Sequence, residues 1–144
     1  MRRLLVTLAL ITSVNAVAEE LAAPKWIEQA RAARAELKIS HPRLFEEVSA
    51  ILYRLDPIGI GIRIGSPPDE YDAEAGTIIP RLQACNSADD VQKAVFEEFV
   101  RWFGADTAGK LDSYADEGTQ VWEAWVRYRK GLPSNTSLER TRDR

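Results

Sequence analysis

The residues best suited to chemistry lie in one short segment, residues 56–74. Four carboxylates fall within the six positions 69–74, directly after a Pro-Pro pair, and a fifth lies upstream at Asp56. Crowded carboxylates can bind a cation, act as a general acid and base, or form an acidic surface for a basic partner. The candidate binding residues are therefore Asp56, Asp69, Glu70, Asp72 and Glu74.

The spacing of these carboxylates does not select catalysis or a metal. An EF-hand loop needs ligands at alternate positions, a central glycine and a closing glutamate, and that order is missing here. Acidic residues after Pro-Pro are also typical of the first turn of a helix, where free N–H groups favour negative charge. His41 is the only histidine and lies at a predicted helix start. We expect it to be a cap, which leaves serine and cysteine triads without a base. We predict no catalytic residue, no metal ligand and no cofactor.

The residues between Asp56 and the acidic run alternate in a way that predicts a short strand. Isoleucines at positions 58, 60, 62 and 64 alternate with Gly59, Gly61 and Arg63, which is the period of an extended chain with one buried face. The glycines have the spacing G-x-G-x-x-x-G and follow a predicted helix. A dinucleotide fingerprint needs a strand, then G-x-G-x-x-G, then a helix, so we do not expect nucleotide binding.

Two short motifs carry a resemblance to a known family. Asp-Pro-Ile-Gly at 56–59 and Asp-Glu-Tyr-Asp at 69–72 are followed by Ile-Ile-Pro-Arg-Leu at 78–82 and an acidic-aromatic helix. This order resembles a family of small, mostly helical bacterial proteins of unknown function, over about residues 44–103. Some similar proteins occur as immunity or accessory genes of mobile elements, which implies binding a partner rather than catalysis. The resemblance supplies no catalytic residues and leaves both ends of the chain unexplained.

The N-terminal residues predict a secretory signal peptide over residues 1–18. Arg2 and Arg3 precede a short apolar run at 4–11, and an A-x-A sequence ends at Ala18. The mature protein is therefore expected in the periplasm or outside the cell, with the cytoplasm as the alternative if this is not a true signal. The apolar run is too short to span a bilayer, so no stable membrane insertion is expected after cleavage.

The charge balance indicates the kind of partner. The whole chain has a formal charge of −3, and cleavage after residue 18 leaves 17 basic residues against 22 acidic residues, a formal charge of −5. An acidic protein has no general affinity for nucleic acid or an anionic bilayer, so we expect a basic protein partner. Cys85 is the only cysteine, and we expect it to be buried on a helix.

Helical spacing of apolar residues predicts the elements that position the carboxylates. It predicts helices at 24–37, 42–55, 88–103 and 111–130, and a weaker helix at 71–82 that Gly76 and Pro80 interrupt. Ser40 or His41 is expected to cap the helix at 42–55, and Ser87 is expected to cap the helix at 88–103. The predicted fold is mainly α, a small bundle of four to five helices with one short extended segment. One helical domain spans 19–133, and a polar tail at 134–144 is predicted to be disordered.

Two functional classes fit this pattern. In the first, an acidic surface on a small periplasmic or secreted interaction protein, of inhibitor or immunity type, engages a basic partner. In the second, the same carboxylates belong to a metal-binding protein or a hydrolase. Geometry distinguishes the two classes, because ligands must converge in a concave pocket, whereas a contact surface needs only to be exposed.

Overall fold

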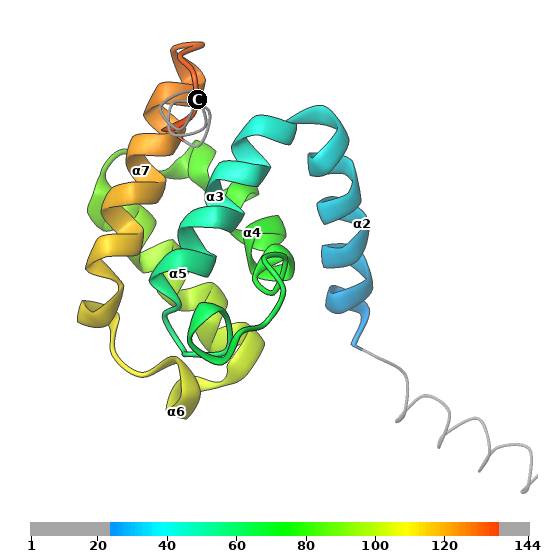
Figure 1. The fold of residues 1–144 in the computed structure, drawn as a ribbon, viewed down its shortest axis with the longest axis vertical. Helices are drawn as coiled ribbons and strands as arrows, with labels where there is room; N and C mark the ends of the chain where they lie inside the picture. The colour runs from blue at the N-terminus through cyan, green and yellow to red at the C-terminus, as the bar shows by residue number, and fades with distance from the viewer. Residues whose placement is uncertain (1–23, 136–144) are drawn as a thin grey trace, which may run out of the picture.

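The computed structural model describes residues 24–135, which are mainly helical, as predicted (Figure 1). The predicted signal peptide and residues 136–144 of the predicted tail lie outside the described residues. No strand occurs within the described part of the chain. The elements are α2 (Lys25–Ser40), α3 (Pro42–Leu55), η1 (Ile62–Ile64), α4 (Asp72–Ile78), η2 (Ile79–Ala84), α5 (Ala88–Phe103), α6 (Ala105–Ala108), η3 (Leu111–Tyr114) and α7 (Ala115–Arg129).

The observed helices follow the apolar periodicity of the sequence. α3 coincides with the helix predicted at 42–55, and α5 with that predicted at 88–103. The weak helix predicted at 71–82 is divided into α4 and η2, because Pro80 has no N–H group to continue the α-helical ladder. Within residues 24–135, the four-residue α6 is the one α-helix that the sequence pattern did not predict.

The strand predicted at residues 58–64 is wrong. This segment is a loop that ends in η1, with Gly59 in a left-handed conformation at a φ of 76°. The alternation of isoleucines has another cause: Ile58 and Ile60 pack against the core, whereas Ile62 and Ile64 are exposed. No strand of the described chain pairs with this segment, and two of its N–H groups, those of Gly61 and Arg63, bond instead to the side chain of Asp56.

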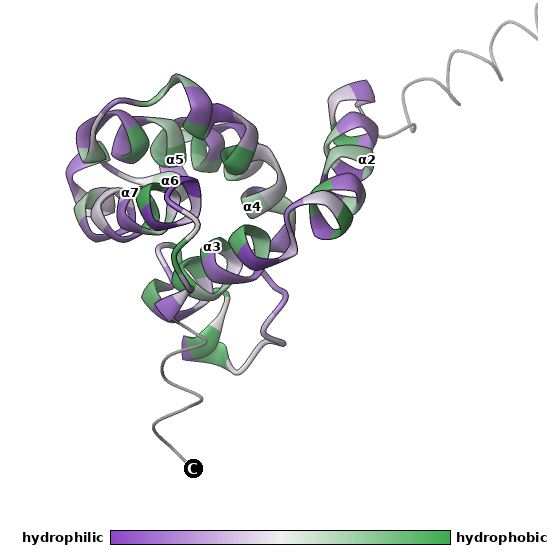
Figure 2. Ribbon diagram, turned by 90° about the horizontal axis from the view of Figure 1, so that it is seen from above, coloured by the Kyte–Doolittle hydropathy of each residue, from purple (hydrophilic) through white to green (hydrophobic). Residues whose placement is uncertain are grey.

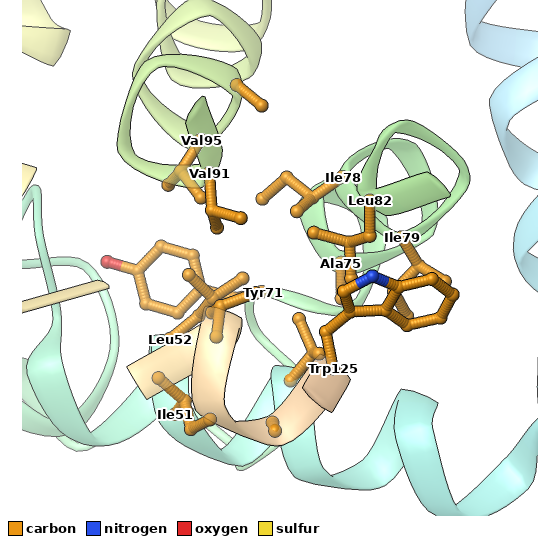
Figure 3. Close-up of a cluster of buried hydrophobic side chains, with 14 of the residues drawn as sticks. Ile51, Leu52, Tyr71, Ala75, Ile78, Ile79, Leu82, Val91, Val95 and Trp125 are labelled. Atoms are coloured by element: carbon orange, nitrogen blue, oxygen red, sulfur yellow. The ribbon is translucent and has the colours of Figure 1, made fainter. Parts of the chain in front are cut away.

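Side chains of α3, α4, η2, α5 and α7 form one hydrophobic core (Figure 3). Trp125 of α7 points into the same cluster as Val91 and Val95 of α5. Among the aromatic side chains of α5 and α7, Phe99 is fully buried and Trp125 nearly so, whereas Phe103 and Trp122 are partly buried against the core. The other members labelled in Figure 3 are Ile51, Leu52, Tyr71, Ala75, Ile78, Ile79 and Leu82.

α2 lies at one side of the bundle, beside α4 and joined to α3 by a sharp turn (Figures 1 and 2). α2 and α4 approach closely at Gly76, where an added Cβ would lie 2.9 Å from the Cβ of Arg34. A side chain at position 76 would therefore push α2 away from α4. The position of α2 matters because its last turn borders the site described below.

The expected caps are present on one helix and absent on another. Ser87 Oγ accepts the N–H of Asp90 at 3.2 Å, as predicted for the start of α5. Neither Ser40 nor His41 caps α3. Ser40 Oγ instead donates to a carbonyl of α2, and His41 Nδ1 lies 2.6 Å from the hydroxyl of Tyr128. His41 thus connects the start of α3 to the end of α7.

Three further observations complete the description of residues 24–135. Cys85 is buried, as expected, but it follows η2 in an extended conformation and does not lie on a helix. Its thiol donates to the carbonyl of Arg81 at 3.4 Å. A largely buried ion pair joins distant elements, with Arg127 Nη2 of α7 2.6 Å from Glu47 Oε1 of α3. Within residues 24–135, no helix combines the length and the apolar character needed to cross a membrane.

Candidate functional site

Asp56 organises the loop between α3 and α4 from the inside. Its side chain is fully buried, and its backbone has a φ of 50°, which closes α3 in a left-handed conformation. Oδ1 accepts the N–H of Gly61 at 2.8 Å and the hydroxyl of Tyr71 at 2.6 Å, and Oδ2 accepts the N–H of Arg63 at 2.9 Å. The carboxylate of Asp56 thus satisfies two N–H groups of the loop that follows α3.

The loop is packed so tightly around Asp56 that Gly61 has no space for a side chain. A Cβ there would lie 2.9 Å from the Tyr71 ring and 3.2 Å from Asp56 Oδ1. Burial alone would raise the pKa of Asp56, but the hydrogen bonds from Tyr71, Arg63 and Gly61 outweigh it and lower the pKa. Burial and the hydrogen bond to Asp56 raise the pKa of Tyr71. Asp56 is therefore an ionised structural group, inaccessible to a ligand.

Glu74 is also buried, but it lacks comparable partners. It lies on α4, with 3% of its surface exposed, and its Oε2 accepts no hydrogen bond from the described residues. Burial raises its pKa to about 7, and the charges of Glu70 and Asp72 add to the increase. Its own backbone N–H and the charge of Arg34 oppose the shift without cancelling it. Glu74 thus changes protonation state near neutral pH.

A groove lies beside α3, where the last turn of α2 and the start of α4 come together. Its volume is about 490 Å³, which is within the range of small-ligand and side-chain pockets. Apolar parts of Phe45, Tyr53 and Pro68 line it, and three carboxylates, those of Glu46, Asp69 and Asp72, lie around it. The remaining lining residues are Lys38, Pro42, Ser49 and Ala50.

A hydrogen bond and an ion pair hold the side chain of Asp72 in the groove. Ser49 Oγ donates to its Oδ1 at 2.5 Å, and Lys38 Nζ lies 2.5 Å from its Oδ2. The same ammonium group lies 5.2 Å from the centroid of the Phe45 ring, within the range of a cation–π interaction. The ammonium group of Lys38 therefore lies in the groove between a carboxylate and an aromatic face.

The structure separates the five predicted site residues into different environments. Asp69 and Asp72 line the groove, and Glu70 is exposed next to it in sequence. Asp56 and Glu74 are buried away from solvent. The carboxylates that cluster in sequence therefore do not form one surface patch.

These carboxylates do not converge as metal ligands. Among the residues that the structure describes, no group of three or more histidine, cysteine, aspartate or glutamate side chains is placed to hold an ion. Asp72, the most central of them, already has Lys38 and Ser49 as partners. The convergence of carboxylates that the metal-binding alternative requires is therefore not found among residues 24–135.

Sequence reasoning missed the groove residues that come from α2 and α3. In the sequence alone, Lys38 and Glu46 resemble ordinary exposed charges on helices, and Phe45 resembles a core residue. Their common signal is weak: an aromatic residue and a lysine seven positions apart across a helix break. No protein-family model, curated protein or solved structure matches the chain, so the functional argument rests on this geometry.

Proposed function

We propose that this protein binds a basic partner protein through the groove beside α3, in the manner of a small inhibitor or immunity protein. The observation that carries the proposal is the composition of the groove. Three carboxylates, those of Glu46, Asp69 and Asp72, line it together with one cation, Lys38, and with apolar residues. Such a surface complements a partner segment that has cationic side chains with aliphatic stems.

Two properties of the whole chain support the same partner class. Its formal charge is −3, which favours encounter with a basic surface and disfavours nucleic acid. We also propose kinship with the bacterial family that the motifs at 56–59 and 69–72 resemble, since some proteins similar to it occur as immunity or accessory genes of mobile elements. We further propose a periplasmic or secreted location, which the basic and apolar pattern of residues 1–18 supports.

A labelled peptide of alternating lysine and leucine tests this proposal by fluorescence anisotropy. Glu46→Gln combined with Asp69→Asn removes two exposed charges from the groove and should weaken binding roughly tenfold. Raised salt should weaken binding to the unchanged protein as well, because the rim charges are exposed.

The matched control is Glu28→Gln combined with Asp106→Asn. It removes the same charge from exposed positions on α2 and α6, outside the groove. We expect it to change affinity by no more than about twofold. Equal losses in the two double variants, or no binding by the unchanged protein, would contradict the proposal.

A further inference from the structure

We infer that Lys38 is a built-in competitor for the groove: its ammonium group occupies the place that a lysine or arginine of the partner takes on binding. The inference rests on the proposed function and names the chemical group that the groove recognises. It also assigns a regulatory role to an ion pair inside the protein. The partner must displace Lys38 from Asp72 to bind.

The acceptor in this ion pair is fixed, whereas the cation is not. The side chain of Asp72 is 9% exposed, and Ser49 orients it with a hydrogen bond of 2.5 Å. The side chain of Lys38 is 48% exposed and extends from the last turn of α2. A half-exposed lysine regains side-chain freedom and hydration when another cation takes its place in an ion pair. Exchanging its ammonium for another cation therefore has a small energetic cost.

A counter-ion for Asp72 is needed in both the free and the bound protein. A nearly buried carboxylate left without a cation is strongly unfavourable. Lys38 supplies that cation in the free protein, and the partner would supply it in the complex. The partner therefore replaces an existing cation and does not fill an empty site.

The surroundings favour an organic cation. The ring of Phe45 presents its face to Lys38 Nζ at 5.2 Å, and such faces attract ammonium and guanidinium groups. Pro42, Tyr53 and Pro68 form apolar walls next to it, suited to the methylene stem of lysine or arginine. The recognised chemistry is therefore a cationic side chain presented by a protein or peptide.

The first test replaces Lys38 with methionine, which keeps the stem and removes the charge. We expect Lys38→Met to tighten binding of the lysine and leucine peptide about tenfold, because the competitor is gone. Lys38→Arg should leave the affinity near that of the unchanged protein. Lys25→Met is the matched control, since it removes the same charge from α2 outside the groove.

An Asp72→Asn background makes the test specific. If Lys38 acts by occupying Asp72, Lys38→Met should give no gain in affinity once the carboxylate is removed. A general charge effect would give the same gain in both backgrounds and would overturn the inference. Circular dichroism of each variant checks that the helical fold is kept.

A second test does not depend on substitutions. Acetylation of Lys38 by a succinimidyl ester is followed by mass spectrometry, with and without a saturating arginine and leucine peptide that has no lysine. Displacement should raise the acetylation rate of Lys38 several-fold, with Lys25 as the internal reference. A lower rate would mean that the peptide covers Lys38 without displacing it, and would overturn the inference.

The outcomes separate the two proposals. If the unchanged protein binds the peptide but Lys38→Met binds no tighter, the inference fails and the proposed function stands. If neither protein binds it, both proposals fail.

Discussion

Asp56 and Glu74 are both buried carboxylates, and their surroundings differ in one decisive respect. Asp56 accepts three hydrogen bonds inside its loop. Glu74, at the interface of α4 with α2, has a buried oxygen without a donor among the described residues. The pKa is lowered at Asp56 and raised at Glu74.

The comparison shows that burial does not determine the role of a carboxylate; its donors do. Donors hold Asp56 in the ionised form, so its charge stabilises the fold. Without them, burial favours the neutral form of Glu74, so its charge is destabilising. The two groups therefore make opposite contributions to the pH dependence of stability, and four predictions test this contrast.

The largest effect is expected for Asp56→Ala. The change leaves the N–H groups of Gly61 and Arg63 and the hydroxyl of Tyr71 without their acceptor, and it places alanine at a φ of 50°. We expect a loss of about 3–5 kcal/mol in the free energy of unfolding. Urea denaturation measures it, with Asp69→Ala as the exposed control. A loss below about 1 kcal/mol would contradict the structural role of Asp56.

The second prediction concerns the pH dependence due to Glu74. Its pKa is raised from 4.5 to about 7 by folding, so its stabilising contribution is fully present below pH 4.5 and is lost as pH rises through 7. The loss amounts to about 3 kcal/mol. Glu74→Gln should therefore reduce the decline between pH 5 and pH 8, to which Glu117 still contributes because burial raises its pKa as well.

The stability of Glu74→Gln is compared with that of the unchanged protein by denaturation at a series of pH values. Glu28→Gln, at an exposed position on α2, should keep the decline. The contribution of Asp56 has the opposite sign: it is present above pH 3.8 and is lost as pH falls through the lowered pKa. The same decline in Glu74→Gln as in the unchanged protein would assign the effect to another group.

An intermediate effect is expected for Tyr71→Phe. The variant keeps the ring, which packs next to Phe99 with centroids 5.7 Å apart, and removes one donor to Asp56. We expect a loss of about 1–2 kcal/mol, as for a hydrogen bond to a charged group. The pKa of Asp56 should rise, which can be followed by carbon NMR of its carboxylate. An unchanged pKa would mean that the backbone donors alone lower it.

The smallest effect is expected for Glu70→Gln. Glu70 is exposed, so its loss should change stability by less than ~0.5 kcal/mol. Its charge raises the pKa of Glu74, so that pKa should move down in the variant. Carbon NMR of the Glu74 carboxyl group gives the direction. An upward shift would show that Glu70 acts on Glu74 through structure and not through charge.

Local sequence patterns predicted much of the fold. The apolar spacing in residues 42–55 and 88–103 is sufficient for α3 and α5, because helix formation and burial of one face are both local in sequence. Proline at position 57 predicted the end of α3 at Asp56. The strand prediction failed because the alternating isoleucines of residues 58–64 belong to a loop. Two of them pack against the core and two are exposed.

The site could not be predicted in the same way, because tertiary packing builds it. Lys38 reaches Asp72 across 34 positions, and Ser49 reaches it across 23. The close packing of α2 on α4 depends on the absence of a side chain at Gly76, and no local pattern encodes that distance. The carboxylates were recognised in the sequence, but their different surroundings required the structure.

The bonds made by Asp56 also have a consequence for the order of folding. They join residues only 5, 7 and 15 positions apart, whereas the Arg127 to Glu47 pair joins residues 80 positions apart. Closing a short loop is fast and loses less chain entropy than closing a long one. We therefore expect the loop after α3 to form early, around its own carboxylate, before α7 docks. The residues that border the groove on this side would then be in place before the domain is complete.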